Sequence, residues 1–156
     1  MEFRIREATR GDEPFLLEML YEALFVPLGS PPFPASVVDR PDVSRYARGF
    51  GHQEGDRGWI AESSARIRVG AAWVRLMPSD DPGYGFVDED TPELSIAVVP
   101  DHRSRGVGTA LLGSLLASVP RCSLSVDDRN PAVSLHSRCG FEVVSTEGHS
   151  LTMLRA

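Results

Sequence analysis

The chain has 156 residues, which suits a single domain over residues 1–156 and leaves little room for a second. Its net charge of −6 argues against nucleic acid as a partner, because binding to nucleic acid depends on basic patches that neutralise phosphates. All 16 basic residues are arginines, and the lack of lysine excludes a Walker-A nucleotide loop and Schiff-base chemistry.

Neither end of the sequence nor its cysteines indicate a membrane or secreted protein. No apolar run approaches the roughly 20 residues that cross a bilayer, so we expect no membrane partner. The first seven residues alternate polar and apolar side chains without a signal-peptide core, which indicates a cytoplasmic protein. Cys122 and Cys139 are too few for a disulfide framework and lack a metal-ligand spacing, so we expect buried, inert thiols and no metal.

The first half of the chain predicts a strand, a helix and a hairpin. Alternation indicates a strand over residues 2–8, and apolar side chains at helical spacing indicate a helix over 11–25. A proline-rich stretch follows, and a short helix is expected over 43–50. Residues 59–62 and 67–76 are then predicted to be the two strands of a hairpin.

The segment 78–92 is a polar connection that is longer than most loops inside a compact domain. Its length predicts a lid, a binding loop or a disordered segment. Its aromatic residues, Tyr84 and Phe86, are expected either to cover a binding site or to pack the loop down. The acidic side chains of the loop would suit a cationic ligand or simply face solvent: Asp80, Asp81, Asp88, Glu89 and Asp90.

The second half of the chain alternates strands with helices. Residues 93–99 indicate a strand that presents Leu94, Ile96 and Val98 on one face. The elements expected after it are a helix over 106–119, a strand over 122–126, a helix from Asn130 to Gly140, and strands over 141–144 and 150–154. This order of elements predicts a mixed α/β sheet.

The turn between the strand that begins at residue 93 and the next helix predicts an anion site. Gly106 and Gly108 lead into a helix N-terminus, where free backbone N–H groups converge and a phosphate can approach closely. Arg103 and Arg105 can add charge-assisted hydrogen bonds. A dinucleotide fingerprint needs a small residue where Leu111 stands, which excludes that site. A tight turn with solvated arginines is the remaining alternative.

Two segments together carry a family resemblance. The spacing Arg103-x-x-Gly106-x-Gly108, between a strand and an amphipathic helix, resembles the acetyl-CoA-binding motif of the GCN5-related N-acetyltransferase (GNAT) family. The segment from Asn130 to Phe141, which contains Ala132, Leu135, His136 and Gly140, resembles the Asn…Ala…Leu-Tyr…Gly-Phe segment of that family. Both segments stand in the order of the family, and the likeness is close over residues 93–144.

The resemblance implies a fold and a cosubstrate. The fold is α/β (α+β), with a mixed, mostly antiparallel central sheet of about six or seven strands, about four flanking helices and a splay between the fourth and fifth strands. Acetyl-CoA is implied as the cosubstrate, with its pantetheine arm along residues 97–99 and its diphosphate on the amides of residues 103–109. The implied cofactor-binding residues are Ala97, Val98, Val99, Arg103, Ser104, Arg105, Gly106, Val107, Gly108, Thr109, Asn130 and Ala132.

Glu93 and His136 are the candidates for the catalytic chemistry. The resemblance makes Glu93 a base that deprotonates the acceptor through a water, and the alternative is a strand-edge carboxylate that faces solvent. His136 replaces the tyrosine that serves the family as acid to the leaving thiolate, and histidine can donate a proton at neutral pH. A helix-face residue without a catalytic role is the alternative for His136. Asp127 and Asp128 are lesser candidates, expected to be turn residues.

The sequence therefore predicts an acetyl-CoA-dependent N-acetyltransferase. The acceptor would be a primary amine, from a small molecule or a protein N-terminus, which attacks the thioester directly in a ternary complex. A monomer or a homodimer is expected. The alternatives are a non-catalytic acyl-CoA-binding sensor or interaction module, and an acyltransferase with a different acyl donor or a hydroxyl acceptor.

Overall fold

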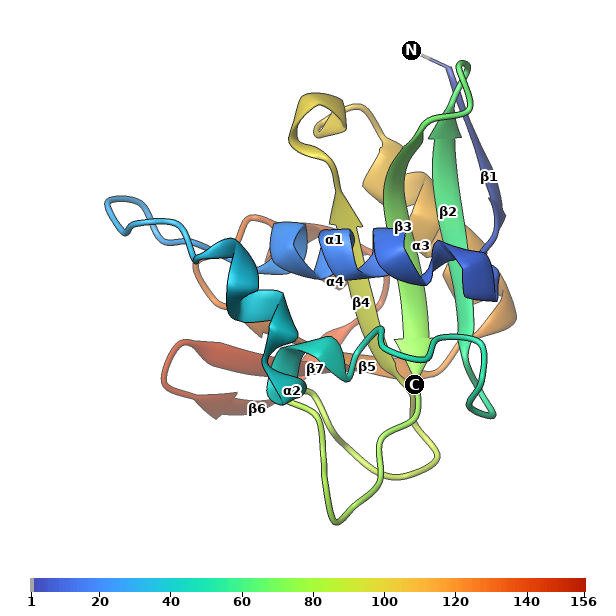
Figure 1. Ribbon diagram of the computed structural model, residues 1–156. Helices are drawn as coiled ribbons and strands as arrows, with labels where there is room; N and C mark the ends of the chain where they lie inside the picture. Colours follow the sequence, from blue (N-terminus) through green and yellow to red (C-terminus); the bar gives the residue numbers. More distant parts are fainter. Residues whose placement is uncertain (1) are drawn as a thin grey trace.

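Seven strands form one sheet in the computed structural model, which describes residues 2–156 (Figure 1). The strands follow the order β1-β2-β3-β4-β5-β7-β6, and every neighbouring pair is antiparallel except β4–β5. Their bounds are β1 Phe3–Glu7, β2 Arg57–Ser63, β3 Arg68–Arg75, β4 Glu93–Val98, β5 Cys122–Asp127, β6 Glu142–Glu147 and β7 Ser150–Arg155. The mixed, mostly antiparallel sheet expected from the sequence is confirmed.

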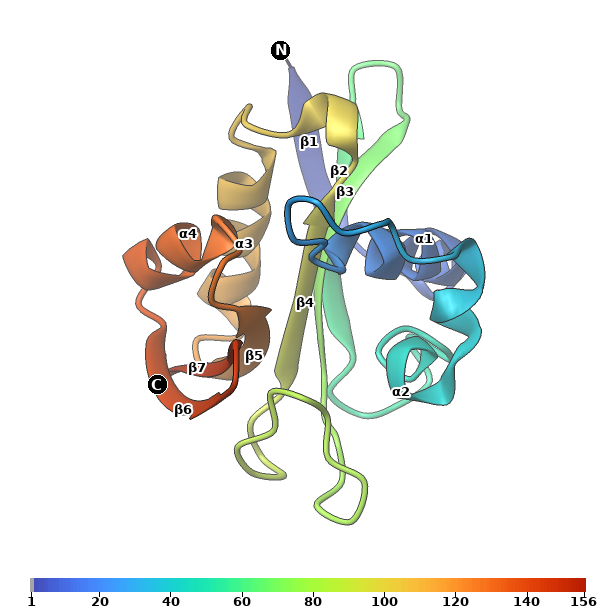
Figure 2. The same cartoon turned by 90° about the vertical axis from the view of Figure 1, so that its left-hand side faces the viewer.

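The strands β4 and β5 diverge from a single point of contact. Their parallel pairing is limited to Glu93 of β4 and Ser123 of β5. Beyond this pair the two strands separate, which is visible when the sheet is seen edge-on (Figure 2). The expected splay between the fourth and fifth strands is therefore confirmed, and it leaves backbone groups of β4 open to other partners.

Helices cover both faces of the sheet (Figure 2). The helices α1 and α2 lie on one face, whereas α3 and α4 lie on the other. Their bounds are α1 Glu13–Ala23, α2 Pro41–Ser44, α3 Val107–Ser118 and α4 Ala132–Arg138. Among residues 2–156, none of the helices has the length and apolarity needed to cross a membrane.

The prediction of a short helix over residues 43–50 is wrong in the position of the helix. The observed helix α2 is one turn long and starts earlier, at Pro41, because proline suits the first position of a helix. Turns follow as far as residue 51. Gly49 and Gly51 adopt φ angles of 76° and 92°, in the left-handed region, and a right-handed helix cannot continue through them.

Each face of the sheet has its own apolar core. One core packs Leu111 and Leu115 of α3 against the sheet, and the other packs Leu16 of α1 against the opposite face. The strand β4 contributes to both, with Leu94 in the α3 core and Ala97 in the α1 core. Because successive side chains of a strand point to opposite faces, both faces of β4 are covered, and this strand is a rigid support for the site beside it.

The two cysteines differ in their burial. Cys122 is completely buried, and this burial raises the pKa of its thiol to about 12. Cys139 is only half-buried. The expectation of a buried thiol is confirmed for Cys122 and is wrong for Cys139.

The connection between β3 and β4, residues 76–92, packs into the narrow end of the splay. Gly85 lies so close to β5 that a Cβ atom there would come within 2.6 Å of the carbonyl carbon of Leu124. The hydroxyl of Ser123 donates to the carbonyl of Gly85 at 2.7 Å. Phe86 is half-buried in this loop. The loop is therefore part of the packed structure, and it closes one end of the gap between β4 and β5.

Candidate active site

Two connected chambers lie along the gap between β4 and β5. The larger chamber has a volume of about 760 Å³ and the smaller one about 250 Å³. Six residues line both chambers: Ala23, Leu24, Ile96, Asn130, Ala132 and His136. These shared walls make the two chambers one continuous cleft, with α1 on one side and α4 on the other.

The larger chamber ends at the glycine-containing loop before α3. Gly106 stands at the N-cap of α3 with a φ of 85°, and Ser104 has a φ of 61°. A Cβ atom on Gly106 would meet nothing within 4 Å, so the backbone angle, not lack of space, favours glycine there. The first intrahelical bond runs from the N–H of Ala110 to the carbonyl of Gly106. The amides of residues 107–109 thus precede the hydrogen-bonded part of the helix and can bind an anion.

Arg103 connects this loop to β4 and α1. Its Nε donates to the carbonyl of Val98 at 2.9 Å, and its Nη2 lies 3.1 Å from Oε1 of Glu22 in α1. All three residues line the larger chamber. Arg103 thus holds two walls of the cleft together. Arg105 lies exposed in the same loop.

The backbone of β4 faces the cleft at alternate residues. The N–H of Val99 donates to the carbonyl of Val69 at 2.8 Å, so Val99 faces β3. In an antiparallel ladder the next residue faces the other way, and the Val98 carbonyl that accepts from Arg103 is on the open side. The same alternation places the backbone groups of Ile96 on the open side, so the residues of β4 that face the cleft are 96 and 98, whereas the prediction was residues 97–99. The alternation in the sequence could have indicated Ile96, because it stands two positions before Val98.

Glu93 is buried at the junction of the smaller chamber and the loop. Glu93 is only 2% exposed, so the alternative of a strand-edge carboxylate that faces solvent is wrong. Oε1 accepts hydrogen bonds from the hydroxyl of Tyr46 at 3.1 Å and from the N–H of Gly85 at 3.0 Å. Oε2 is buried without a hydrogen-bond partner. Burial raises the pKa of the Glu93 carboxyl above its usual value, since it disfavours the charged form.

Tyr46 is a site residue that the sequence analysis missed. Its hydroxyl donates to Glu93 and accepts the N–H of Tyr84 at 2.7 Å. Its carbonyl accepts the indole N–H of Trp73 at 2.7 Å, which fixes the segment to β3. Burial, with the Glu93 carboxylate beside it, raises the pKa of the Tyr46 hydroxyl. Local sequence gives no signal for this residue, because its partner Glu93 lies 47 positions further along the chain.

His136 lies on α4 at the boundary of the two chambers. The residue is 4% exposed, and Nδ1 is buried without a hydrogen-bond partner. Its ring packs edge-on against Phe141, with 5.8 Å between ring centroids. Burial lowers the pKa of the imidazole to about 4, so the ring is neutral at pH 7. The sequence predicts His136 as a proton donor at neutral pH, but a ring with so low a pKa does not carry the extra proton that such a donor gives up.

Asn130 and Ala132 lie together where α4 begins. The side-chain Oδ1 of Asn130 accepts the N–H of Ala132 at 2.9 Å, which fixes the start of the helix. Both residues line both chambers. The helix starts two residues after Asn130, one position later than proline at the first helical position would place it.

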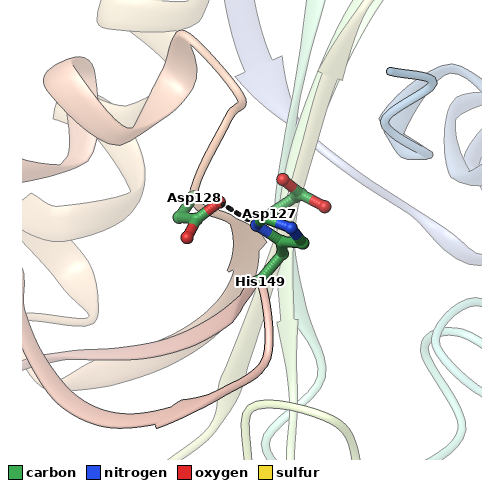
Figure 3. A group of neighbouring side chains, drawn as sticks. All are labelled: Asp127, Asp128 and His149. Carbon is green, nitrogen blue, oxygen red and sulfur yellow. Dashed lines mark hydrogen bonds and ion pairs between the residues drawn. The ribbon is translucent and has the colours of Figure 1, made fainter.

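Asp127 and Asp128 form a separate cluster with His149 at the end of β5 (Figure 3). One carboxylate oxygen of each aspartate and one imidazole nitrogen of His149 lie within 4.8 Å of one another. The Asp128 carboxylate lies 2.9 Å from Nδ1 of His149, and both Asp127 oxygens accept hydrogen bonds from Arg129. None of these four residues is among those that line the two chambers. Their contacts match the turn role expected for Asp127 and Asp128.

The acidic side chains of the loop 76–92 are largely engaged within the protein. Asp81 pairs with Arg45 at 2.7 Å, and Asp88 accepts from the hydroxyl of Thr91 at 2.8 Å. Glu89 accepts the N–H of Ser79 at 3.1 Å. These acidic residues are not among those that line either chamber. The loop contributes Tyr84 to the smaller chamber instead.

Comparisons with known proteins agree with this architecture. A sequence profile of the Acetyltransferase (GNAT) family matches residues 17–141. No curated protein matches the sequence. The fold resembles the paiA N-acetyltransferase of Thermoplasma acidophilum in complex with coenzyme A, with 17% identity, 99% of each chain covered and a TM-score of 0.69.

Two further solved structures have the same fold. One is the ribosomal-protein-alanine N-acetyltransferase of Brucella melitensis, with 22% identity, 97% of this chain and 98% of that chain covered, and a TM-score of 0.64. The other is a chimera of the spermidine N-acetyltransferase SpeG from Vibrio cholerae and hSSAT, with 19% identity, coverage of 99% and 95%, and a TM-score of 0.60. At these identities the likeness establishes the fold.

Proposed function

Because the chain belongs to the GNAT family of acetyltransferases, we propose that it transfers an acetyl group from acetyl-CoA to a primary amine by direct attack in a ternary complex. The observation that carries the proposal is Glu93. Its carboxylate is buried in the smaller chamber, is held through one oxygen, and leaves Oε2 without a partner. An amine bound in this chamber would have the Glu93 carboxylate as its proton acceptor.

The larger chamber is the proposed site of acetyl-CoA. The amides at the start of α3 would bind the diphosphate, and the helix dipole adds about 0.3–1 kcal/mol of preference for an anion. The open backbone edge of β4, at Ile96 and Val98, would pair with the pantetheine arm. The likeness of the fold to a protein that binds coenzyme A supports this assignment.

In this chemistry two protons leave the nitrogen of the acceptor and one proton reaches the sulfur of coenzyme A. The acceptor enters as an ammonium ion, and Glu93 takes one proton from it, directly or through a water. The free amine attacks the carbonyl carbon of the thioester, and a β4 amide, that of Ile96 or Val98, would stabilise the oxyanion. The C–S bond then breaks, the nitrogen loses its second proton, and the thiolate takes up a proton and leaves as coenzyme A. The product is an amide.

His136 is proposed to stabilise the departing sulfur. It lies where the two chambers meet, and its ring is neutral at pH 7. A neutral imidazole can donate a hydrogen bond to the thiolate without transferring the proton. The role is therefore that of a hydrogen-bond donor, in place of the acid that the resemblance implied for this position.

Replacing Glu93 by glutamine tests the proposal. The variant keeps the size of the side chain and removes the base, so kcat should fall roughly 100- to 10,000-fold. Release of the coenzyme A thiol with a panel of amines measures kcat, and calorimetric titration with acetyl-CoA should show unchanged affinity. Glu142→Gln, on the exposed strand β6, is the matched control and should leave both quantities unchanged. Full turnover by Glu93→Gln contradicts the proposed base.

A non-catalytic acyl-CoA-binding module is the second candidate function. The observation that favours it is the histidine at the position where the family has a tyrosine acid. Binding of acetyl-CoA by calorimetry, with no thiol release on any amine, would establish this second function. Thiol release with an alcohol in place of an amine would instead indicate a hydroxyl acceptor.

A further inference from the structure

The smaller chamber limits the size of the acceptor. Its volume of about 250 Å³ is below the roughly 300–1,000 Å³ of sites for drug-sized ligands. Its inner end is closed by Glu93 and by the backbone of the loop at Gly83, where a Cβ atom would lie 2.3 Å from the Glu93 carboxylate oxygens. The chamber therefore holds a molecule of roughly ten non-hydrogen atoms, with its amine toward Glu93.

The walls of the smaller chamber are mostly apolar. The helix α1 contributes Leu20, and Leu24 follows directly after this helix. The strand β4 contributes Ile96, and β5 contributes Leu124 and Val126. Transfer of an apolar group from water to such walls is favourable in proportion to the area buried. The body of the acceptor is therefore apolar.

One carboxyl group that lines the smaller chamber has no ion-pair partner among the described residues. The ionisable residues that line it are Asp42, Tyr46, Tyr84, Glu93 and His136. The two oxygens of Asp42 accept hydrogen bonds from Arg40 at 3.1 and 2.8 Å, so its charge is already paired. Burial lowers the pKa of His136 and raises the pKa of Tyr46, which leaves both neutral. Among the lining residues described, Glu93 is the carboxyl group without an arginine partner: its Oε1 accepts hydrogen bonds from Tyr46 and Gly85, and its Oε2 has no hydrogen-bond partner.

The outer rim of the chamber is bridged between the loop and α2. The hydroxyl of Tyr84 donates to Oδ2 of Asp42 at 2.5 Å, and the Tyr84 N–H donates to Tyr46. Tyr84 is 62% exposed, which places this bridge at the solvent edge of the chamber. A polypeptide with its N-terminus in the chamber, and with its chain leaving between the loop and α2, would have to displace the bridge.

We propose that the acceptor is a small monoamine with an apolar body, and that polyamines and protein N-termini are poor acceptors. The inference rests on the proposed acetyltransferase function and narrows its acceptor. A second ammonium group in the chamber would be desolvated without a counter-charge, which is strongly unfavourable. The acidic residues outside the chamber do not compensate, because Asp81, Asp88 and Glu89 are engaged with partners of their own.

The test compares acceptors that differ only in the second charge. Thiol release at saturating acetyl-CoA is measured with pentylamine, with 1,5-diaminopentane, and with a peptide that has an N-terminal alanine. We expect kcat/KM for pentylamine to exceed that for the diamine by at least about tenfold after correction for its two amino groups, and the peptide to be slower still. A diamine or peptide that equals pentylamine overturns the inference and leaves the acetyltransferase function standing. No thiol release with any amine, despite acetyl-CoA binding, overturns the function itself.

A substitution in the wall tests the charge argument directly. Ser125 is exposed on β5 and lines the smaller chamber, so Ser125→Asp adds a second carboxylate without disturbing the core. In this variant the ratio of kcat/KM for pentylamine to kcat/KM for the diamine should fall by about tenfold or more, and the melting temperature should stay unchanged. Ser145→Asp, on exposed β6, adds the same charge outside the residues that line the chamber and should leave the preference unchanged. An unchanged preference in folded Ser125→Asp overturns the assignment of this chamber to the acceptor.

Discussion

Burial shifts the pKa values of Glu93 and His136 in opposite directions. Burial disfavours the charged form of any group, so the pKa of the carboxyl rises and the pKa of the imidazole falls to about 4. The raised value makes Glu93 a stronger base than an exposed carboxylate. The lowered value keeps His136 neutral across the physiological range. Burial therefore acts in opposite directions on the pKa values of two groups that line the same chamber, and suits them to different roles.

At the residue scale, the kinetic role of His136 is testable. Loss of its hydrogen bond to the leaving sulfur should lower kcat in His136→Ala by more than about tenfold, whereas His136→Asn, which keeps an N–H donor, should retain more activity.

The sign of the pH dependence of kcat/KM follows from the directions in which the pKa values are shifted. Glu93 must be ionised, so kcat/KM falls as pH falls through its raised pKa. His136, with a pKa of about 4, adds no step near pH 6.5.

The pH–rate profiles of the wild type and of His136→Ala provide the check. Both should show the same acid limb, because that limb belongs to Glu93. An ionisation near pH 6.5 in the wild type that disappears in His136→Ala would show that the histidine acts as a charged acid, and would contradict the neutral ring.

At the scale of elements, the loop 76–92 determines the surroundings of Glu93. Gly83 lies against the Glu93 carboxylate, and Gly85 donates its N–H to that carboxylate while it packs against β5. The sequence indicated a loop that was too long for a simple connection, but it left a lid, a binding loop and a disordered segment open. Packing of glycine backbone between two diverging strands decided among them, and no local pattern encodes such a contact.

Substitution of Gly85 should disturb this packing. In Gly85→Ala the new methyl group would meet the main chain of Leu124 and Ser125 at 2.6–2.7 Å, and main chain cannot move aside as a flexible side chain can. The expected loss of stability is about 1–3 kcal/mol, together with a lower kcat/KM because the loop also holds Glu93. Thermal unfolding and thiol release measure the two effects.

Gly113→Ala in α3 is the matched control. A Cβ atom there meets nothing within 4 Å, and removal of glycine from a helix interior stabilises by about 0.5–1 kcal/mol. Its melting temperature should therefore rise or stay the same, and its activity should be unchanged. Equal stability of Gly85→Ala and the wild type would mean that the loop is not packed against β5 in solution.

At the scale of the whole molecule, a buried ion pair attaches the segment around Tyr46 to the sheet. Arg75 of β3 binds both oxygens of Asp56 at 3.0 and 2.8 Å, and its Nη1 donates to the carbonyls of Arg45 and Arg48. Arg75 is completely buried. The pair therefore connects three parts of the chain that are distant in sequence, and it holds Tyr46 in reach of Glu93.

Removing one member of this pair should be strongly destabilising. Arg75→Met leaves the Asp56 carboxylate buried without a counter-charge, at an expected cost of about 3–5 kcal/mol in denaturant unfolding. The double variant Arg75→Met with Asp56→Asn removes the stranded charge and should recover part of the loss. Arg129→Met is the control, because Arg129 pairs with Asp127 at the same 2.8 Å on the surface, where the loss should be at most about 1 kcal/mol. Equal losses in the two single variants would contradict the structural role of the pair.

Much of the fold was predictable from the sequence alone. Strand alternation, helical spacing and the glycines before α3 are local signals, and they gave the order of the elements and the position of the anion loop. The alternation of Leu94, Ile96 and Val98 also predicted that these residues share one face of β4, and the structure packs that face into the core that contains α3. The resemblance added the splay between β4 and β5, which a single paired position confirms.

The tertiary structure alone decided the chemistry around these elements. The sequence determined that Glu93 opens a strand and that His136 stands on a helix, but either side chain could have faced solvent. Their burial depends on segments far away in the chain: Tyr46 and Gly85 for Glu93, and Phe141 with the walls of the cleft for His136. Charge state, hydrogen-bond partners and the volume of the acceptor chamber all follow from that burial. Each is a property of long-range contacts, which a one-dimensional pattern does not contain.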